Sequence, residues 1–336
     1  MIDAALIWEW IIKSLILILF LTVGFAYVTW YERRLLARIQ NRIGPNRVGK
    51  FGLLQPVADA VKLIFKEELI PANADKLIFI IAPIITVTPA LVVLAVVPWG
   101  ESLQLFGRTI DLFITDINVG IVYIMAVTSI SVYGITLAGW SSNNKYSLLG
   151  GLRATAQMIS YELALGLSFV GPVILAGSLS LMDIVRTQQN GLWFVIPQIA
   201  AFIIYFFASI AEINRAPFDM PEAEQELTAG FLSEYSGMKF AVFFMAEYIK
   251  MIAISAIGVT LFLGGFDGPF VGQLPWLGPI YFLGKIIIWL GILIWVRATW
   301  PRIRYDRLMA LGWKILFPAA LLNVMVTAIV VAVIGK

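Results

Sequence analysis

Residues 117–144 contain no charged side chain, and this single stretch restricts the kinds of fold that the chain can adopt. About 20 apolar residues in a helix cross a bilayer core of about 30 Å. A charge-free stretch of this length is typical of a transmembrane helix, so at least part of the chain is expected to lie inside a lipid bilayer.

Long apolar stretches recur along the whole chain. Hydrophobic residues make up 60% of it and charged residues 13%, whereas soluble domains contain about 45–50% apolar and about 25% charged residues. We therefore expect an all-α polytopic membrane protein that forms one integral membrane domain over residues 1–336, without an internal repeat. About eight spans are predicted, at residues 8–30, 77–98, 117–140, 154–177, 191–212, 239–263, 279–298 and 314–334.

The basic residues between the spans predict the orientation of the chain. The segments "ERRLLARIQNRIGPNRVGK" and "RATWPRIRYDRLMALGWK" hold six and five basic residues, with one acid each. Of the 24 Lys and Arg residues, 18 lie on the side of these two loops, three on the other side and three within spans. Because cytoplasmic loops carry the excess of Lys and Arg, both termini are expected on the opposite, periplasmic side.

Residues 52–67 are too short and too charged to span a bilayer, but they are amphipathic. Apolar residues recur there at helical spacing, while Asp59, Lys62 and Lys66 share the other face. This pattern predicts an interfacial helix near the cytoplasmic surface. Simple anchoring to the membrane surface and a role in binding are both open interpretations of this helix.

The chain contains no cysteine and no histidine. Their absence excludes disulfides, thiolate-held iron–sulfur clusters, histidine-ligated haem and the usual zinc or copper sites. We therefore expect no metal, haem or iron–sulfur cluster and no catalytic redox group in this chain, so any electron carrier belongs to a partner. The net charge of +3, with basic residues confined to membrane-flanking loops, does not indicate nucleic acid binding.

Two acids lie inside predicted spans, Glu162 in the fourth and Glu247 in the sixth, and Glu212 ends the fifth. An unpaired acid facing lipid at mid-membrane is unfavourable by roughly 2.5–3.5 kcal/mol. Lys250 lies three residues after Glu247, close enough to pair with it. A structural ion pair would explain one such acid, but three of them favour a buried proton or ion path.

The segment 212–237, "EINRAPFDMPEAEQELTAGFLSEYSG", is an acidic loop on the side where loops should be basic. Its carboxylates alternate with apolar residues, and its prolines limit regular helix. A solvated acidic loop is the simpler interpretation. The apolar residues instead favour a loop packed partly into the protein, which predicts a charge-lined cavity at the cytoplasmic interface.

Three long segments resemble a known family. "YERRLLARIQNRIGPNRVGKFGLLQPVADAVKLIFKEE", "AEINRAPFDMPEAEQELTAGFLSEYSGMKFAVFFMAEY" and "RATWPRIRYDRLMALGWKILFP" are similar to the quinone-site membrane subunit of respiratory complex I, the NADH–quinone oxidoreductase of bacteria and mitochondria. The resemblance covers essentially the whole chain. It implies a proton-pumping, NADH-driven enzyme in the bacterial inner membrane, in which this subunit forms much of a quinone-access tunnel opening from the lipid.

The resemblance also implies roles for individual residues. Quinone, the one ligand expected, would contact Glu32, Arg33, Asp59, Lys62, Arg215 and Phe218. The proton path and its coupling to quinone reduction would involve Tyr161, Glu162, Glu212, Glu222, Glu224, Glu226, Glu247 and Tyr248. Some relatives carry a further acid in the third span, where this chain has Thr128, Ser129 and Ser131. The implied partners are iron–sulfur subunits on the cytoplasmic side, antiporter-like and other membrane subunits, and lipid.

Three alternatives compete with this interpretation. The membrane anchor of an ion-pumping hydrogenase shares the fold and the loop acids, although the intact "EINRAPFDMPEAEQEL" and "GPNRVG" stretches favour the quinone enzyme. A stand-alone secondary transporter would usually show repeated halves, and we find none. A passive scaffold would leave the buried acids unexplained.

Overall fold

The computed structural model describes residues 4–105, 108–220 and 224–334, most of which are helical. The helices are α1 (Ala4–Ile39), α2 (Gln55–Ile64), α3 (Lys76–Val92), α4 (Gly120–Ser141), α5 (Lys145–Ala176), α6 (Leu181–Gln189), α7 (Ile199–Glu212), α8 (Glu224–Leu227), α9 (Gly237–Phe262), α10 (Leu277–Thr299), α11 (Tyr305–Ala310) and α12 (Phe317–Ile334). The strands β1 (Ser102–Leu105) and β2 (Arg108–Asp111) pair antiparallel, with Ser102 opposite Asp111 and Leu105 opposite Arg108.

Seven helical stretches in the described part of the chain are long and apolar enough to cross a bilayer, and α7 is a shorter apolar helix beside them. The long stretches are Ile7–Ile39, Lys76–Val96, Gly120–Ser141, Lys145–Ala176, Gly237–Phe262, Leu277–Thr299 and Tyr305–Val333. The predicted fold class, an all-α polytopic membrane protein, is confirmed.

Helix α7 is shorter than the apolar run that contains it. The run begins at Gly191, but residues 191–193 are irregular and residues 194–198 form turns, in which the Val195 amide donates to the Phe262 carbonyl over 2.9 Å. Pro197 explains the late start, because proline has no amide hydrogen and disfavours helix at the residue before it. Conversely, α1 continues into the basic segment as far as Ile39, and α5 begins at Lys145.

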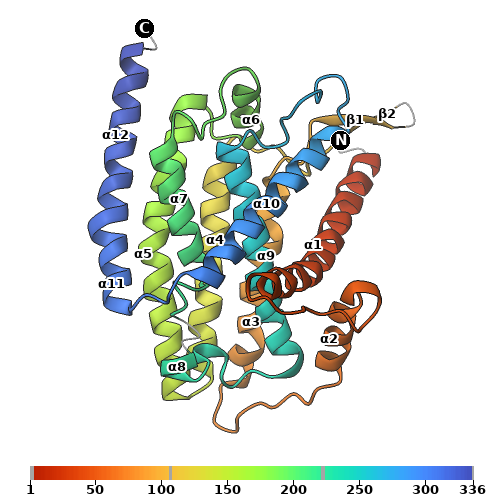
Figure 1. The fold of residues 1–336 in the computed structure, drawn as a ribbon, viewed down its shortest axis with the longest axis vertical. Helices are drawn as coiled ribbons and strands as arrows, with labels where there is room; N and C mark the ends of the chain where they lie inside the picture. Colours follow the sequence, from red (N-terminus) through yellow and green to blue (C-terminus); the bar gives the residue numbers. More distant parts are fainter. Residues whose placement is uncertain (1–3, 106–107, 221–223, 335–336) are drawn as a thin grey trace.

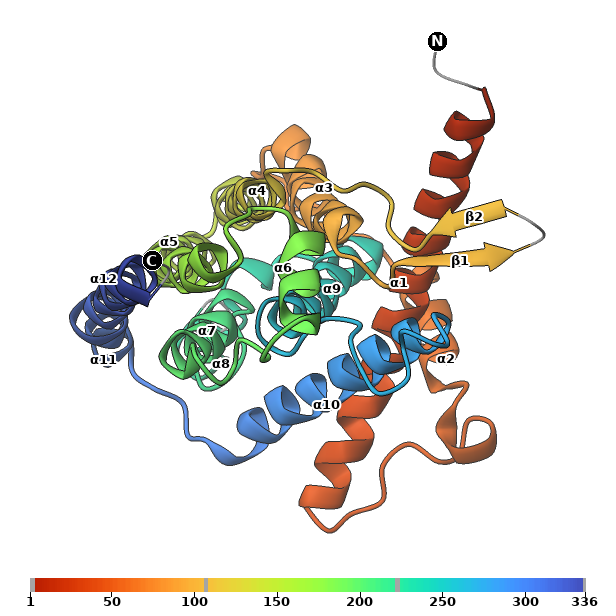
Figure 2. The same cartoon turned by 90° about the horizontal axis from the view of Figure 1, so that it is seen from above.

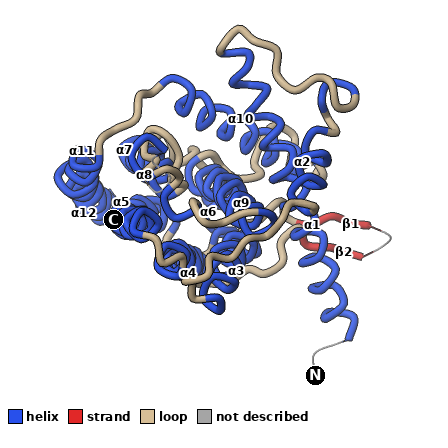
Figure 3. The backbone as a smooth tube through the Cα atoms, turned by 90° about the horizontal axis from the view of Figure 1, so that it is seen from below, coloured by secondary structure: helices blue, strands red, loops and turns tan. Residues whose placement is uncertain are grey.

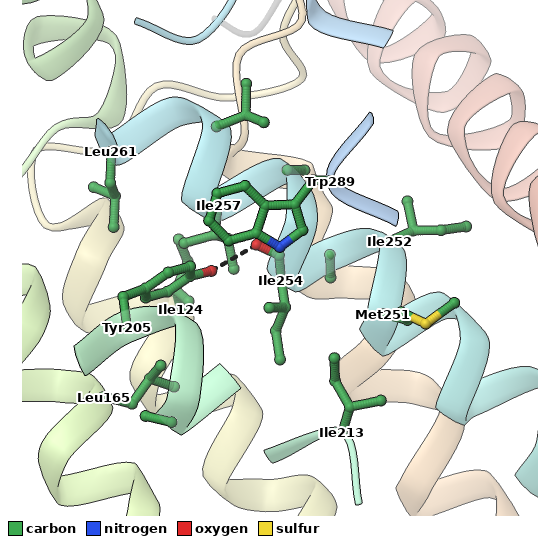
Figure 4. Packing of buried hydrophobic residues seen from close by; sticks show 14 of the residues in the cluster. Ile124, Leu165, Tyr205, Ile213, Met251, Ile252, Ile254, Ile257, Leu261 and Trp289 are labelled. Carbon is green, nitrogen blue, oxygen red and sulfur yellow. Dashed lines mark hydrogen bonds between the residues drawn. The ribbon is translucent and has the colours of Figure 1, made fainter. Parts of the chain in front are cut away.

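Helix α9 lies at the centre of the bundle, as the view from above shows (Figure 2). Every residue from Tyr248 to Phe262 is buried. A helix that is buried all round needs mostly apolar side chains on every face, and this stretch has them except at Lys250, Ser255 and Thr260. In Figure 4 the Tyr205 hydroxyl of α7 donates to the Ile254 carbonyl of α9 over 2.6 Å, beside Trp289 of α10.

Helices α3 and α4 approach closely because a glycine lies at their contact. A Cβ atom on Gly134 would lie 2.1 Å from the Thr86 hydroxyl oxygen and 2.8 Å from the Thr86 backbone nitrogen. Only a residue without a side chain allows the two backbones to come this near.

Polar side chains join the C-terminal helix to the bundle. Gln198, which precedes α7, donates from Nε2 to the Thr327 hydroxyl over 2.9 Å, and its Oε1 accepts from Asn323 Nδ2 over 3.0 Å. Thr327 and Asn323 are one turn apart on α12. We call these three residues the α12 latch, because hydrogen bonds between helices hold membrane bundles together.

The beginning of α1 and the end of α12 lie at the same end of the molecule, together with β1 and β2, while α8 lies at the opposite end (Figure 1). Helix α2 is in the half of the molecule nearer to α8, beside α1 (Figures 1 and 3). Three of its apolar side chains, Val57, Val61 and Ile64, are exposed.

Candidate functional site

Arg215, three residues after the end of α7, is the centre of a buried ion-pair cluster. Its Nη1 donates to both carboxylate oxygens of Glu32 on α1, over 2.8 and 2.9 Å, and its Nε donates to Glu247 on α9. Its guanidinium lies 4.2 Å from the ring centroid of Tyr248, a cation–π distance. Arg215 therefore ties the acidic loop to two helices.

Arg297 at the end of α10 is a second base in this cluster, because it also pairs with Glu32. Glu32 is only 2% exposed, so its charge would be unfavourable without these two guanidinium groups. Burial alone would lower the pKa of Arg215, but Glu247 and Tyr248 together outweigh burial and raise that pKa above its ordinary value. Arg215 is therefore positively charged at every accessible pH.

Arg33, the residue after Glu32, points to a different place, since neighbouring residues on a helix lie about 100° apart. It pairs with Asp59 of α2 over 2.6 Å, and Lys62 lies 3.9 Å from the other oxygen of Asp59. These three residues line a groove of about 370 Å³ between α1, α2 and α9. Most of the other lining side chains are apolar, among them Phe25 and Phe244.

Phe218 and Tyr161 lie together, away from this groove. Phe218 is fully buried, and its ring centroid is 5.9 Å from that of Tyr161 on α5. The Tyr161 hydroxyl donates to the Leu308 carbonyl of α11 over 2.8 Å. Both side chains hold the loop and the C-terminal segment against α5.

The inner acids lie among α4, α5, α7 and α9. Glu162 accepts a hydrogen bond from the hydroxyl of Ser129 on α4. Glu212 is 3% exposed, and its Oε2 accepts no hydrogen bond from the described residues. Lys250 interacts electrostatically with Glu212, Glu162 and Glu247.

The spacing of Glu247 and Lys250 on α9 predicted an ion pair between them, but the structure pairs Glu247 with Arg215 instead. The direct partner of Glu247 is Arg215, and Glu247 and Lys250 both line a cavity of about 40 Å³. Asn214 and Thr86 supply further polar atoms to that cavity. Spacing along α9 could predict the proximity of Glu247 and Lys250, but not the competing guanidinium, which comes from another segment.

The loop acids occupy the edge of this site. Glu226 pairs with Arg153 over 2.7 Å and with Arg302 over 3.6 Å, and Glu234 accepts from Asn144 over 2.7 Å. Of the other two acids predicted here, Glu222 lies outside the described residues. The backbone of Glu224 begins α8, but its side chain is outside the description as well.

Two side chains that sequence reasoning did not select hold the loop in place. Gln157 Nε2 donates to the carbonyls of Ala211 and Phe218, each over 2.8 Å. Tyr235 stacks on Phe79 with ring centroids 4.0 Å apart, and burial raises the pKa of Tyr235 to about 12. In the sequence, Gln157 stands out only as a single glutamine among apolar residues of a predicted span. Arg297, likewise missed, was one of several bases in its segment.

The fold and this site define a class: an integral membrane protein in which buried acids and bases lead from a lateral groove into the helix bundle. Among the described residues, no group of three or more His, Cys, Asp or Glu could hold a metal ion.

The family model described as NADH dehydrogenase matches residues 12–328. The chain therefore belongs to the NADH dehydrogenase family. It is 54% identical over 314 residues to the H subunit of the NADH-quinone oxidoreductase of Thermomicrobium roseum, covering 91% of each chain. It is 52% identical over 335 residues to the second H subunit of the same enzyme in Geobacter metallireducens, covering 96% of this chain and 95% of the relative. The first H subunit of Geobacter sulfurreducens is 51% identical over 333 residues, with 95% and 94% covered.

Proposed function

We propose that this chain is a membrane subunit of a proton-pumping NADH–quinone oxidoreductase, in which it admits quinone from the bilayer and couples quinone reduction to proton movement. The names of its relatives, which share about half of its residues over nearly full length, support the enzyme. The groove between α1, α2 and α9 is the observation that carries the quinone part of the proposal.

The chemistry of the groove suits a quinone. A quinone has an apolar isoprenoid tail and a polar ring whose oxygens accept hydrogen bonds. The groove offers apolar side chains along its length, and Arg33 and Lys62 as donors at one place. The exposed apolar side chains of α2 would sit in the membrane interface, so the ligand could enter from lipid.

The ion pairs of Arg215 support the coupling part of the proposal. Glu32 and Arg33 share one turn of α1, so a change of charge in the groove acts directly on the Glu32–Arg215 pair. Arg215 in turn holds Glu247, which shares a cavity with Lys250. Charge produced when quinone is reduced therefore has a short electrostatic route to Glu212 and Glu162.

The same proposal assigns partners and orientation. Because the chain has no cysteine and no histidine, electrons reach quinone from iron–sulfur subunits, which cover the side bearing α2 and α8. Antiporter-like and other membrane subunits continue the proton path. The chain lies in the bacterial inner membrane, with the basic loops in the cytoplasm and both ends in the periplasm. The relatives' names favour this enzyme over a hydrogenase anchor or a lone transporter.

The quinone part is tested by Asp59→Asn in sealed membranes that hold the whole enzyme. We expect the KM for quinone to rise about tenfold, equal to about 1.4 kcal/mol of lost binding, because Arg33 and Lys62 lose the carboxylate that orients them. Oxidation of NADH by ferricyanide, a soluble acceptor that bypasses quinone, should stay unchanged. Glu67→Gln, an exposed acid near the same helix, is the matched control. If the KM for quinone is the same in Asp59→Asn and Glu67→Gln, quinone does not bind in this groove.

The coupling part is tested by Glu212→Gln in the same membranes. Replacing this buried carboxyl by an amide, which cannot take up and release a proton, should abolish most proton pumping and slow quinone reduction with it, because the two processes are linked. The measurements are acidification of the vesicle lumen and NADH oxidation with and without an uncoupler. The coupling role is wrong if quinone reduction and pumping both stay at the level of the unaltered enzyme.

A further inference from the structure

Helix α2 has little apolar packing to hold it against the bundle. Pro56 is its one buried residue, and Val57, Val61 and Ile64 are exposed. Because α2 borders a groove instead of a filled interior, fewer apolar contacts fix its position than fix a packed helix. The position of α2 therefore depends on its polar contacts.

Two sets of polar contacts hold α2, one on each side of the groove. In the middle of the helix, Asp59 pairs with Arg33 of α1 over 2.6 Å, and both residues line the groove. Beyond the end of the helix, residues 66–68 contact the start of α9. The second set joins α2 to the helix that forms the opposite wall of the groove.

This second set consists of an ion pair and a hydrogen bond. The Lys239 ammonium of α9 pairs with the Glu68 carboxylate over 2.5 Å, and the Lys239 side chain is only 17% exposed. The Ser236 hydroxyl donates to the backbone carbonyl of Glu67 over 2.8 Å. We call Glu67, Glu68, Ser236 and Lys239 the α2 clasp.

The start of α9 fits the segment after α2 closely. Ser236 is the N-cap residue of α9, where a serine hydroxyl usually accepts from an amide of its own helix, but here it makes no such bond and donates to Glu67. A Cβ atom on Gly237 would lie 3.0 Å from Cγ of Glu68 and 3.2 Å from the Lys66 carbonyl oxygen. The N-terminal end of α9 also favours a nearby carboxylate such as that of Glu68.

The α2 clasp lies next to both walls of the groove but is not part of either. Met238 and Phe240, the two neighbours of Lys239 in sequence, line the groove from α9, and Ile64 lines it from α2. The four clasp residues are not among the lining residues. A ligand in the groove would therefore feel the clasp only through the separation of these two walls.

We propose that the α2 clasp positions α2 against α9 and so sets the width of the quinone groove along its apolar walls, where the isoprenoid tail lies. This inference rests on the proposed function and deepens it, because it makes the tail the part of the quinone to which the groove is selective. The donors Arg33 and Lys62 would hold the ring, so the tail lies against the apolar side chains of α2 and α9.

The effect of the clasp is one of pre-organisation. With the clasp closed, the groove already has the shape that the tail requires, and binding does not have to order α2. With the clasp open, α2 can move away from α9, so a long tail loses contacts on one wall. The ring is held by other residues and is affected less.

The test compares Glu68→Gln, Lys239→Met and the double variant in the whole enzyme in proteoliposomes. KM and kcat are measured for a quinone with one isoprene unit and for a quinone with a tail of several units. We expect the KM for the long-tailed quinone to rise about two- to fivefold, the range for a partly exposed ion pair, and the KM for the short-tailed quinone to rise less. The kcat should stay unchanged, and the double variant should be no worse than the stronger single variant.

Two controls are matched to these variants. Lys76→Met removes an exposed lysine from the first turn of α3, just as Lys239→Met removes one from the first turn of α9, and it should leave both KM values unchanged. Lys239→Arg keeps the charge and should keep the KM for the long-tailed quinone. NADH–ferricyanide activity should report equal amounts of enzyme in all variants.

Three results would overturn the inference: unchanged KM values in both single variants, an equal rise for the two quinones, and losses that add in the double variant. If Lys239→Met does not assemble, Ser236→Ala and Ser236→Thr decide the matter. The clasp requires the alanine variant, which loses the donor to Glu67, to raise the KM for the long-tailed quinone. It requires the threonine variant, which keeps the hydroxyl, to leave that KM unchanged, and equal KM values in the two variants overturn it.

The clasp and the proposed function can fail separately. If Asp59→Asn raises the KM for quinone while the clasp variants do not, the quinone groove stands and only the role of the clasp falls. If Asp59→Asn leaves the KM unchanged as well, the quinone part of the proposed function falls first.

Discussion

Two neighbouring residues on α1 face two different parts of the protein. Glu32 points inward, where Arg215 and Arg297 neutralise it, and Arg33 points into the groove, where it meets Asp59. This divergence follows from the turn of about 100° between successive helical residues. One turn of one helix therefore connects the surface where a ligand could bind with the buried charges.

Arg215→Met should destabilise the protein, because it leaves the carboxylates of Glu32 and Glu247 short of a buried partner. Breaking a buried ion pair from one side typically costs about 3–5 kcal/mol. Because the pKa of Arg215 is raised, its charge is constant, and the effect should be fully present near neutral pH. The measurement is the thermal midpoint of the purified enzyme, followed through loss of quinone reduction.

Arg304→Met is the control for Arg215→Met. Arg304 is paired with Asp306 over 3.1 Å, but its side chain is 82% exposed, and exposed ion pairs contribute about 0–1 kcal/mol. If the two variants have similar thermal midpoints, the ion pairs of Arg215 do not stabilise the protein as expected.

Sequence reasoning identified the ionisable residues better than their partners. Charge inside apolar runs singled out Glu162 and Glu247, and the loop motif singled out Arg215. It did not pair Arg215 with Glu32, which is 183 positions away, and it overlooked Arg297 and Gln157. Partner choice depends on how helices cross, and hydropathy along one chain carries no information on crossing.

At the scale of helices, the contact between α3 and α4 depends on Gly134. Its absent side chain lets the backbone of Thr86 approach, so the neighbour that a Cβ would meet is rigid main chain as well as a hydroxyl. Small residues at such contacts are characteristic of membrane helix pairs.

Gly134→Ala should therefore force α3 and α4 apart. We expect a destabilisation of about 1–3 kcal/mol, the usual range for overpacking a filled interior. Gly284→Ala on α10 is the control, since nothing lies within 4 Å of a Cβ there. Thermal midpoints of the two purified variants provide the measurement, and a Gly134→Ala midpoint equal to that of Gly284→Ala would show that the helices can separate freely.

The long apolar helices were predictable from sequence because length and hydropathy alone indicate them. The start of α7 at Ile199 is not visible in hydropathy: its one sequence signal is Pro197, and the turns over 194–198 also depend on contacts such as that of Val195 with Phe262. The π-helical turn over Leu311–Leu316, which joins α11 to α12, was likewise not predicted. Such local departures are decided by packing and have no signal in periodicity.

At the scale of the whole molecule, α1 and α12 lie at opposite flanks of the bundle, as the view from above shows (Figure 2). Both helices expose many apolar side chains. In a membrane these faces meet lipid or other subunits. Helix α12 packs on α5 and is joined to the segment before α7 by the α12 latch. The hydrogen bonds of the α12 latch therefore connect α12 to the segment before α7.

The α12 latch can be measured with a double-mutant cycle on Gln198→Leu and Asn323→Leu. Interhelical hydrogen bonds in membranes average about 0.6 kcal/mol, with a maximum near about 1.7 kcal/mol, so we expect a coupling in that range. The cycle is read from thermal midpoints of the purified enzyme and its three variants. Coupling of zero would mean that apolar packing alone holds α12.

The arrangement of the two chain ends has a practical consequence. Because α1 begins and α12 ends on the same side, away from α8, a handle fused to either end leaves the surface around α2 and α8 uncovered (Figure 1). A protein immobilised on a sensor by such a handle would present that surface to molecules in solution. Fluorophores attached at both ends would report changes in the spread of the bundle without touching the groove.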